Sequence, residues 1–409
     1  MPPILAAMRR NALASTLIAV QIALTLAILS NALFIIHERL VSMARPSGVD
    51  ESQLFAIQNQ WVGEPHDVAA RAETDLAALR ALPSVVDAYV TNAYPLSGVL
   101  FIVPVTLHPD DKSSNRLVGM YFGDSHTLRT LGLRLIVGRN FSADDVQNLS
   151  GALDSHRPPG GIMVSQQLAD SLAPKGNVIG RQLTVRALGV FSAPIVAVVQ
   201  DLQVAGVHPP GFLHLLGDES VLISYRDTAA GSYYVVRAQS APQLGSLMRA
   251  ATARLYAVNG LRVVGRVESM SDARQRAYRG DRGQAVMLAT VSAILLAMTG
   301  WGIVGLTSCW VNQRRRHIGI RRAMGATPAA IVYYFQTENL LIAAAGVAAG
   351  VGLAIAANLW MISRFQMDRL DYRYVLLGAV VVLALGQLAT LWPALRAASV
   401  PPAEAARSA

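Results

Sequence analysis

The chain has 409 residues, of which 53% are hydrophobic and 15% charged, and its mean hydropathy is positive. This composition excludes an ordinary soluble protein, because the apolar residues gather in long runs of the kind that cross membranes. The net charge is +9, but residues 40–280 carry 21 basic and 20 acidic residues and are nearly neutral. The basic excess lies in short segments beside the apolar runs, which indicates membrane topology and not nucleic-acid binding.

The first apolar run, residues 12–36, follows Arg9 and Arg10. At 1.5 Å per residue, about twenty helical residues cross the hydrocarbon core, so this run is long enough to span it. A cleavable signal peptide is the alternative, since Ser30-Asn31-Ala32 loosely resembles a cleavage site. The run exceeds a usual signal core, so residues 1–39 are predicted to be a cytoplasmic segment and a retained first span.

Residues 40–280 are predicted to form a mixed α/β domain. Short apolar runs are typical of strands, and apolar residues spaced by three or four are typical of helices. The predicted strands are 54–58, 85–90, 103–107, 117–122, 183–190, 194–199, 221–224, 233–236 and 261–267. Helices are predicted at 67–82 and 242–256, a strand followed by a helix at 162–173, and loops at 154–161 and 208–211. No twenty-residue apolar run interrupts the region, so it is expected to lie on one side of the membrane.

Three further apolar runs make up residues 281–409. The second span is predicted within 284–311, the third at 336–361 and the fourth at 374–393, where Pro393 is expected to close it. The sequence therefore predicts an α-helical membrane protein with four transmembrane helices. A large α/β extracytoplasmic domain is expected between the first and second of them.

The charge bias sets the expected orientation. Short loops rich in arginine are typically cytoplasmic, so both termini and the loop 312–330 are predicted to be inside. Four arginines on the outer side, just before the second span, conflict with this rule, namely Arg274, Arg276, Arg279 and Arg282. Long translocated domains are largely exempt from the rule, so we expect the inner cluster to decide the topology.

No enzyme motif is present in the sequence. Its two lysines, Lys112 and Lys175, do not end a G-x-x-x-x-G-K-[ST] loop, and H-E-x-x-H and G-x-S-x-G are absent. His208 and His214 flank a Pro-Pro-Gly turn, which favours an exposed loop over a metal site, and the single Cys309 lies in an apolar run. No charged residue lies in the middle of a predicted span, so no ion relay is indicated. We therefore assign no catalytic or metal-ligating residue.

The segment from Gln313 to Thr327, QRRRHIGIRRAMGAT, contains five arginines between two apolar runs. One interpretation is a topology determinant that needs only its charge. A second uses its other residues: a short helix with an apolar side is predicted, ended by Gly325 and followed by a new helix at Thr327-Pro328. That apolar side would consist of Ile318, Ile320, Ala323 and Met324. Such a helix at the membrane face suits docking into a groove of a cytoplasmic partner.

Small residues recur within the spans. Gly346 and Gly350 form a small-x-x-x-small pair in the third span, and Gly300, Gly302 and Gly305 are similar in the second. Small residues let helix backbones approach closely. The pairs are compatible with packing between subunits and equally with packing within one chain.

Several segments together resemble one family. HIGIRRAMGATPAAI resembles the R-E-I-G-I-R-x-A-x-G-A motif of FtsX/MacB-type ABC transporter permeases, in which His317 replaces the usual Glu. Five further segments are similar to the family in the same order: MRRNALASTLIAVQIAL, TNAYPLSG, YFGDSHTLRTLGLRLIVGRNFSADD, VSQQLADSLAPKGNVIGRQL with PIVAVVQDLQVAGV, and WPALRAASVPPAEAAR. The replacement of Glu by His removes a carboxylate, so an ionic contact of the family's Glu is not carried over.

The resemblance implies an inner-membrane permease subunit without a fused ATPase. It implies a porter-like part at 50–93 and 221–272, with an inserted part at about 97–220, in a MacB-like periplasmic domain. The implied partners are a cytoplasmic ABC ATPase dimer that hydrolyses ATP with magnesium, a second identical or related permease, a periplasmic adaptor and an outer-membrane channel. No cofactor is expected on this chain.

Under the resemblance, the chain would couple ATP hydrolysis to the periplasm and export a peptide, antibiotic-like or lipid-linked substrate. Regulation of a cell-wall hydrolase or a sensor without cargo is the alternative. A membrane-anchored enzyme is disfavoured, because no catalytic constellation is visible. The implied ATPase-coupling residues are Arg314, Arg315, Arg316, His317, Ile318, Gly319, Ile320, Arg321, Arg322, Met324, Gly325 and Ala326, and the helix-packing residues are Gly346 and Gly350.

Overall fold

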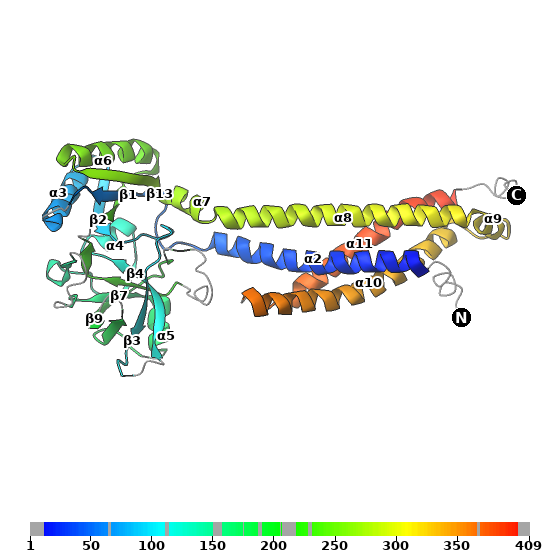
Figure 1. Cartoon of the computed structure of the whole chain (residues 1–409), viewed down its shortest axis with the longest axis horizontal. Helices are drawn as coiled ribbons and strands as arrows, with labels where there is room; N and C mark the ends of the chain where they lie inside the picture. Colours follow the sequence, from blue (N-terminus) through cyan, green and yellow to red (C-terminus); the bar gives the residue numbers. More distant parts are fainter. Residues whose placement is uncertain are drawn as a thin grey trace. The chain divides into compact units, whose positions relative to one another are not determined.

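The computed structural model describes residues 12–63, 67–110, 114–149, 158–174, 176–186, 190–204, 206, 218–227, 231–365 and 369–399 (Figure 1). The chain divides into two units. One, here called the α/β unit, is Arg45–Arg279. The other, the membrane unit, comprises the chain before and after it.

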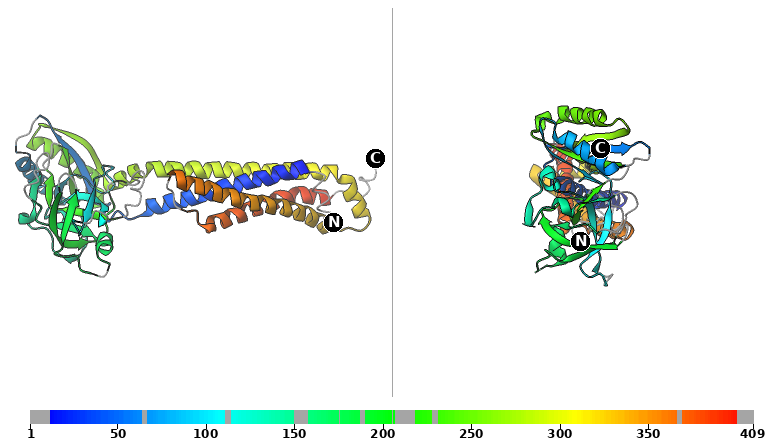
Figure 2. Two further views of the ribbon diagram at one scale, coloured as in Figure 1. Left: turned by 60° about the horizontal axis from the view of Figure 1, so that its bottom comes forward. Right: turned by 90° about the vertical axis from the view of Figure 1, so that its left-hand side faces the viewer.

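Four long helices make up most of the membrane unit: α2 (Ala12–Ala44), α8 (Arg279–Gln313), α10 (Pro328–Phe365) and α11 (Tyr372–Ala398). They have 33, 35, 38 and 27 residues, so each exceeds the roughly twenty residues that cross a bilayer core. Within the described residues these four are the helices with the length and hydropathy of membrane spans. Figure 2 shows them running along one another. Of the four, α2 is the most buried within the structure and α8 the least.

The helix of the predicted fourth span continues past Pro393, where the sequence predicted its end. Helix α11 continues through this residue to Ala398. A proline removes one backbone hydrogen bond and crowds the preceding turn, but it does not require the helix to stop. Here Pro393 is buried, and the residues after it pack in an apolar cluster with Val311, Ile318, Ile331 and Phe335. This packing stabilises the last turn of the helix.

The first sheet of the α/β unit is antiparallel, with the strand order β13-β1-β12-β2. Its strands are β1 (Leu54–Trp61), β2 (Val85–Thr91), β12 (Gly231–Ala238) and β13 (Arg262–Ser269). Helices α3 (Val68–Arg80) and α6 (Leu244–Val258) cover one face (Figure 1), where Leu76, Leu79 and Leu255 pack on Phe55 and Ile57. Strand, helix and strand therefore occur twice, as in ferredoxin-like split β-α-β folds, with a long insertion between the halves.

The insertion is a small closed barrel. Its strands are β3 (Ile102–Thr106), β4 (Arg116–Phe122), β7 (Ile162–Ser165), β8 (Gln182–Arg186), β9 (Val190–Val199) and β10 (Ser220–Ile223). They run in the order β9-β7-β10-β4-β3-β8, and β9 also pairs with β8, which closes the ring. Strand β5 (Leu135–Gly138) adds to β9 from outside. Buried side chains of all six barrel strands fill the interior.

Two strand predictions differ from the structure. Strand β10 lies in the range predicted for the porter-like part, but it pairs with β4 and β7 of the barrel because Val221 and Ile223 are buried in the barrel core. The predicted strand 183–190 is two strands, since β8 ends at Arg186 and β9 begins at Val190. The loop 208–211 and most of 154–161 lie outside the described residues.

Five short elements were not predicted. They are α4 (Thr127–Leu131), β5, β6 (Gln147–Leu149), β11 (Tyr225–Asp227) and α7 (Met270–Ala277). The three short strands have three or four residues each, too few for a periodic pattern to show. The remaining predicted strands and helices of the α/β unit are confirmed within a few residues.

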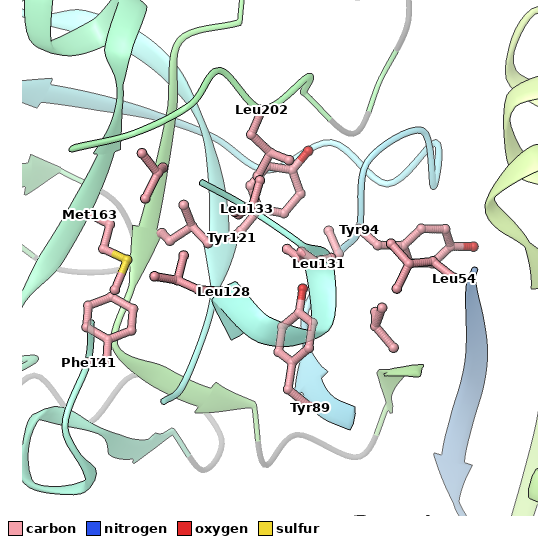
Figure 3. Close-up of a cluster of buried hydrophobic side chains, with 14 of the residues drawn as sticks. Leu54, Tyr89, Tyr94, Tyr121, Leu128, Leu131, Leu133, Phe141, Met163 and Leu202 are labelled. Atoms are coloured by element: carbon pink, nitrogen blue, oxygen red, sulfur yellow. The ribbon is translucent and has the colours of Figure 1, made fainter. Parts of the chain in front are cut away.

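A shared apolar core joins the first sheet to the barrel. Figure 3 shows one cluster that extends from Leu54 and Tyr94 on the sheet side, past Leu131 and Leu128, to Met163 of the barrel. Burial raises the pKa of the phenols of Tyr89, Tyr94 and Tyr121 above the usual value, so these rings are neutral. The sheet and the barrel therefore pack together within one compact unit.

Candidate functional site

The arginine-rich segment folds as a short helix between two membrane helices. After α8 ends at Gln313, α9 runs over Arg315–Ala323. Gly325 then takes a φ of 95°, and the amides of Ala326 and Gly325 donate to the carbonyls of Arg321 and Arg322. This is a Schellman cap, which needs a left-handed residue that glycine supplies without strain. The hydroxyl of Thr327 then accepts from the amide of Ala330 and starts α10 at Pro328.

The predicted apolar side of this helix is divided between two faces. Ile318 is buried in the apolar cluster with residues of α8, α10 and α11, so it is not open for docking as predicted. Ile320 is 51% exposed and Met324 75% exposed. Residues two apart lie about 200° apart around a helix, which explains why Ile318 and Ile320 point to opposite sides. Ala323 is exposed with Ile320 and Met324, at helical spacings of three and four.

The arginines of the segment also differ in their surroundings. Arg315 and Arg321 are exposed, and the guanidinium of Arg321 lies 5.2 Å from the centre of the Tyr334 ring. Arg322 is half-buried, and Gly319 is buried. The exposed residues Arg315, Ile320, Arg321, Ala323 and Met324 are called the α9 surface from here on. Arg316 and His317 belong to α9, but their side chains lie outside the described part of the structure.

Arg314 does not lie on this surface. It occupies the turn between α8 and α9, and its Nη1 donates to Glu338 of α10, 2.9 Å from Oε2 and 3.3 Å from Oε1. The carboxylate is 2% exposed and the guanidinium side chain 22% exposed. The pair therefore faces the interior of the membrane unit. The sequence analysis instead grouped Arg314 with the residues expected to contact a partner.

The predicted packing glycines lie where α10 approaches α2. A Cβ atom on Gly346 would meet the carbonyl oxygen of Ala19 at 2.8 Å, and one on Gly350 would meet that of Ala23 at 2.9 Å. Both distances are shorter than van der Waals contact with a fixed backbone allows. Within the chain, these glycines let α10 lie directly on α2. Gly302 likewise approaches Gln21, whereas Gly305 faces open space.

The chain passes between the membrane unit and the α/β unit twice, near residue 45 and near residue 279, and we call these two stretches the connecting segments. Two ion pairs that the sequence did not predict lie at their ends. In the α/β unit, Arg274 of α7 binds Glu51 through Nε and Nη2 at 2.6–2.9 Å and donates to the carbonyl of Arg45. In the membrane unit, Arg39 of α2 binds Asp281 of α8 at 3.0 Å. Within each unit, therefore, an ion pair joins the first connecting segment to the second.

These pairs also account for part of the conflict in the charge pattern. Arg274 is paired with Glu51 and Arg276 with Glu268, both at 2.6 Å. The charge-assisted hydrogen bonds that the guanidinium groups donate to these carboxylates raise the pKa of both arginines, so the arginines stay charged and paired. Four arginines in nine residues were the signal in the sequence, but the partner of Arg274 is 223 residues away in the chain and that of Arg276 is eight residues away.

Two family models match the chain. The model of the MacB-like periplasmic core domain matches residues 14–254, and that of the FtsX-like permease C-terminal domain matches residues 289–402. The chain belongs to the FtsX/MacB-type ABC transporter permeases. The four apolar helices, with a large α/β domain between the first and second, are the architecture that the sequence predicted, and it is confirmed.

Among curated proteins, the chain is similar to the macrolide export ATP-binding/permease protein MacB of Nitrobacter winogradskyi, with 32% identity over 33% of this chain and 21% of that protein. MacB of Chromobacterium violaceum is 24% identical over 68% of this chain and 41% of its own length. The pyoverdine export ATP-binding/permease protein PvdT of Pseudomonas syringae pv. tomato is 30% identical over 33% and 20%. The chain thus spans less than half the length of these relatives.

Among solved structures, the periplasmic region of MacB from Actinobacillus actinomycetemcomitans covers 56% of this chain and 94% of its own length. The sequence identity is 12% and the TM-score 0.34. The family assignment itself rests on the two matched models. The family consists of permease components of ABC transporters. Its members are inner-membrane proteins with a periplasmic domain.

Proposed function

We propose that this chain transmits ATP hydrolysis by a separate cytoplasmic ATPase dimer to its periplasmic domain. One observation carries the proposal: the α9 surface is exposed, while the opposite side of the same helix is buried against α8, α10 and α11. A partner can bind the exposed face of α9, and a displacement of α9 would then reach the membrane helices through its buried face. The chain has no P-loop, so the partner binds the ATP and magnesium.

In this proposal the α9 surface and both termini are cytoplasmic, and a second identical or related permease completes the assembly. The exposed apolar residues Ile320 and Met324, beside Arg315 and Arg321, suit a groove with apolar walls and an acidic rim. The chain itself performs no catalysis. Its effect on the periplasm is mechanical, and the pairs Arg274–Glu51 and Arg39–Asp281 support it because they keep the two connecting segments together.

We propose export as the outcome of this motion. Two curated relatives are export proteins by name, for macrolides and for pyoverdine, which supports a peptide, antibiotic-like or lipid-linked cargo. A periplasmic adaptor and an outer-membrane channel would complete the route. The alternative is regulation of a cell-wall hydrolase or a sensor, which the same mechanical coupling would serve without cargo. A deletion strain that accumulates or becomes sensitive to such compounds supports export, whereas a division or cell-wall defect alone supports regulation.

The docking role is tested by association with the ABC ATPase encoded in the same gene cluster. The chain is reconstituted in nanodiscs, and its dissociation constant for the ATPase is measured by interferometry. We expect Ile320→Asp and Met324→Asp each to weaken binding about tenfold or more, because a carboxylate placed in an apolar contact loses its hydration. A tenfold change in the dissociation constant corresponds to about 1.4 kcal/mol.

Val190→Asp is the matched control, because Val190 is 65% exposed on the α/β unit and makes no part of the α9 surface. It is expected to bind as the unchanged chain does. Wild-type affinity in both α9 variants, or an equal loss in the control, would remove the α9 surface from the docking role.

A further inference from the structure

The pair of Arg314 and Glu338 is unusual for its position on a membrane helix. Glu338 is ten residues from the first residue of α10, which corresponds to about 15 Å along the axis. Its carboxylate is nearly inaccessible, and Arg314 reaches it from the turn that precedes α9. Charged side chains inside apolar helix bundles are costly unless paired, and by default they mark a functional position. The family assignment and the α9 surface give this pair no role.

The pair lies in a layer where four helices meet. Ile331 and Phe335 of α10 pack there with Val311 of α8, Ile318 of α9 and Ala394 of α11. Two residues before Glu338, the Nε2 atom of Gln336 donates to the carbonyl of Gln387, which ties α10 to α11. Arg314 also donates to the hydroxyl of Tyr334, 3.4 Å away. The ion pair thus connects the α8–α9 turn to α10 beside an apolar cluster.

Some side-chain amide atoms near the pair are left without a hydrogen-bond partner. Among the described residues, Gln336 Oε1, Asn339 Nδ2 and Gln387 Nε2 are buried and have no partner. Buried polar groups without partners cost free energy, so this layer does not hold its best hydrogen bonding in the conformation described. The unpaired atoms are one acceptor, Gln336 Oε1, and two donors, Asn339 Nδ2 and Gln387 Nε2, so an arrangement of α10 against α11 that brings the acceptor to either donor would be better satisfied. The layer therefore has the ingredients of an element with two arrangements, as transmission between distant sites requires.

We propose that Arg314 and Glu338 are the internal link through which a displacement of α9 moves α10, so that Arg314 positions the helices and does not contact the ATPase. The inference rests on the proposed function and deepens it. It divides the arginines of one segment by task, with Arg315 and Arg321 outside for docking and Arg314 inside for transmission. A charge-assisted hydrogen bond is directional, which apolar contacts are not, so the pair fixes the position of the α8–α9 turn relative to α10.

The test uses the full chain with the same ATPase in nanodiscs and two readouts. The first is the dissociation constant of the complex. The second is the ATP-dependent change in hydrogen exchange of residues 45–51 and 270–278, which belong to the α/β unit. We expect Arg314→Ala and Glu338→Gln to keep the dissociation constant within about twofold of the unchanged chain and to reduce the ATP-dependent change at least tenfold.

Arg314→Lys should retain part of the exchange change, because an ammonium still reaches the carboxylate but does not reproduce the hydrogen bonds that Nη1 donates to both carboxylate oxygens and to the Tyr334 hydroxyl. The double variant Arg314→Ala/Glu338→Gln should be no worse than either single variant, as for two residues that act through one contact. Arg315→Ala is the control, an exposed neighbour whose loss should weaken binding.

The outcomes separate the two proposals. An unchanged chain that does not bind the ATPase overturns the proposed function and this inference with it. Binding by the unchanged chain, together with weakened binding of Arg314→Ala, makes Arg314 a docking residue and overturns the inference alone. A wild-type exchange change in both single variants also overturns it, because the displacement then travels without the pair.

Discussion

Replacing Arg262 with alanine is expected to destabilise the α/β unit by about 3–5 kcal/mol, the range for breaking a buried ion pair. Arg262 and Asp75 are both fully buried, and two guanidinium nitrogens lie 2.7 Å from the two carboxylate oxygens. The hydroxyl of Tyr234 donates to the same carboxylate, and Arg262 stacks over Trp61 at 4.3 Å. The alanine variant leaves Asp75 charged and buried without its partner.

The measurement is urea unfolding of the full chain in detergent, followed by pulse proteolysis of the α/β unit. Arg116→Ala is the control, since its pair with Glu219 is exposed at 3.5 Å and should contribute less than about 1 kcal/mol. The double variant Arg262→Met/Asp75→Leu should recover much of the lost stability, because it removes both charges. A loss below about 1 kcal/mol for Arg262→Ala would show that this pair is not essential to the first sheet.

The second large effect is expected for Gly350→Leu in the membrane unit. A Cβ atom at this position meets the backbone of Ala23 at 2.9 Å and 3.0 Å, and a backbone cannot move aside as a long side chain can. The leucine must push α10 away from α2. Overpacking of this kind costs about 1–3 kcal/mol. The double variant Gly346→Leu/Gly350→Leu should cost more than the single one, because both positions contact α2.

Gly352→Leu is a matched control on the same helix, because a Cβ atom there meets nothing within 4 Å. Unfolding by sodium dodecyl sulfate, followed by circular dichroism of the helices, gives the free-energy difference. Equal stability of the Gly350 and Gly352 variants would contradict close packing of α10 on α2 within one chain.

Much of the architecture could be predicted because its signals are local. The apolar runs gave the membrane helices, and the short apolar runs of the α/β unit gave most of its strands. The end of α9 was also local, since Gly325 and Thr327-Pro328 specify a cap and a new start. The prediction that the helix ends at Pro393 was wrong, because the packing of α11 after this residue depends on residues of three other helices.

The parts that could not be predicted depend on contacts between residues distant in the sequence. Burial of Ile318 needs α10 and α11 to cover one side of α9, and nothing in the segment itself says which side that is. Arg314 looks like its neighbours in sequence, and only the position of Glu338 sets it apart. The barrel likewise closes because β9 is long enough to pair with both β7 and β8.

The most direct measurement is hydrogen exchange of the α/β unit in the complex of this chain with its ATPase, compared with ATP and with ADP. We expect ATP to change the exchange of residues 45–51 and 270–278 in the unchanged chain and to leave it unaltered in Met324→Asp. Exchange that is the same with ATP and ADP, in a complex that binds and hydrolyses ATP, would contradict transmission to the periplasmic domain.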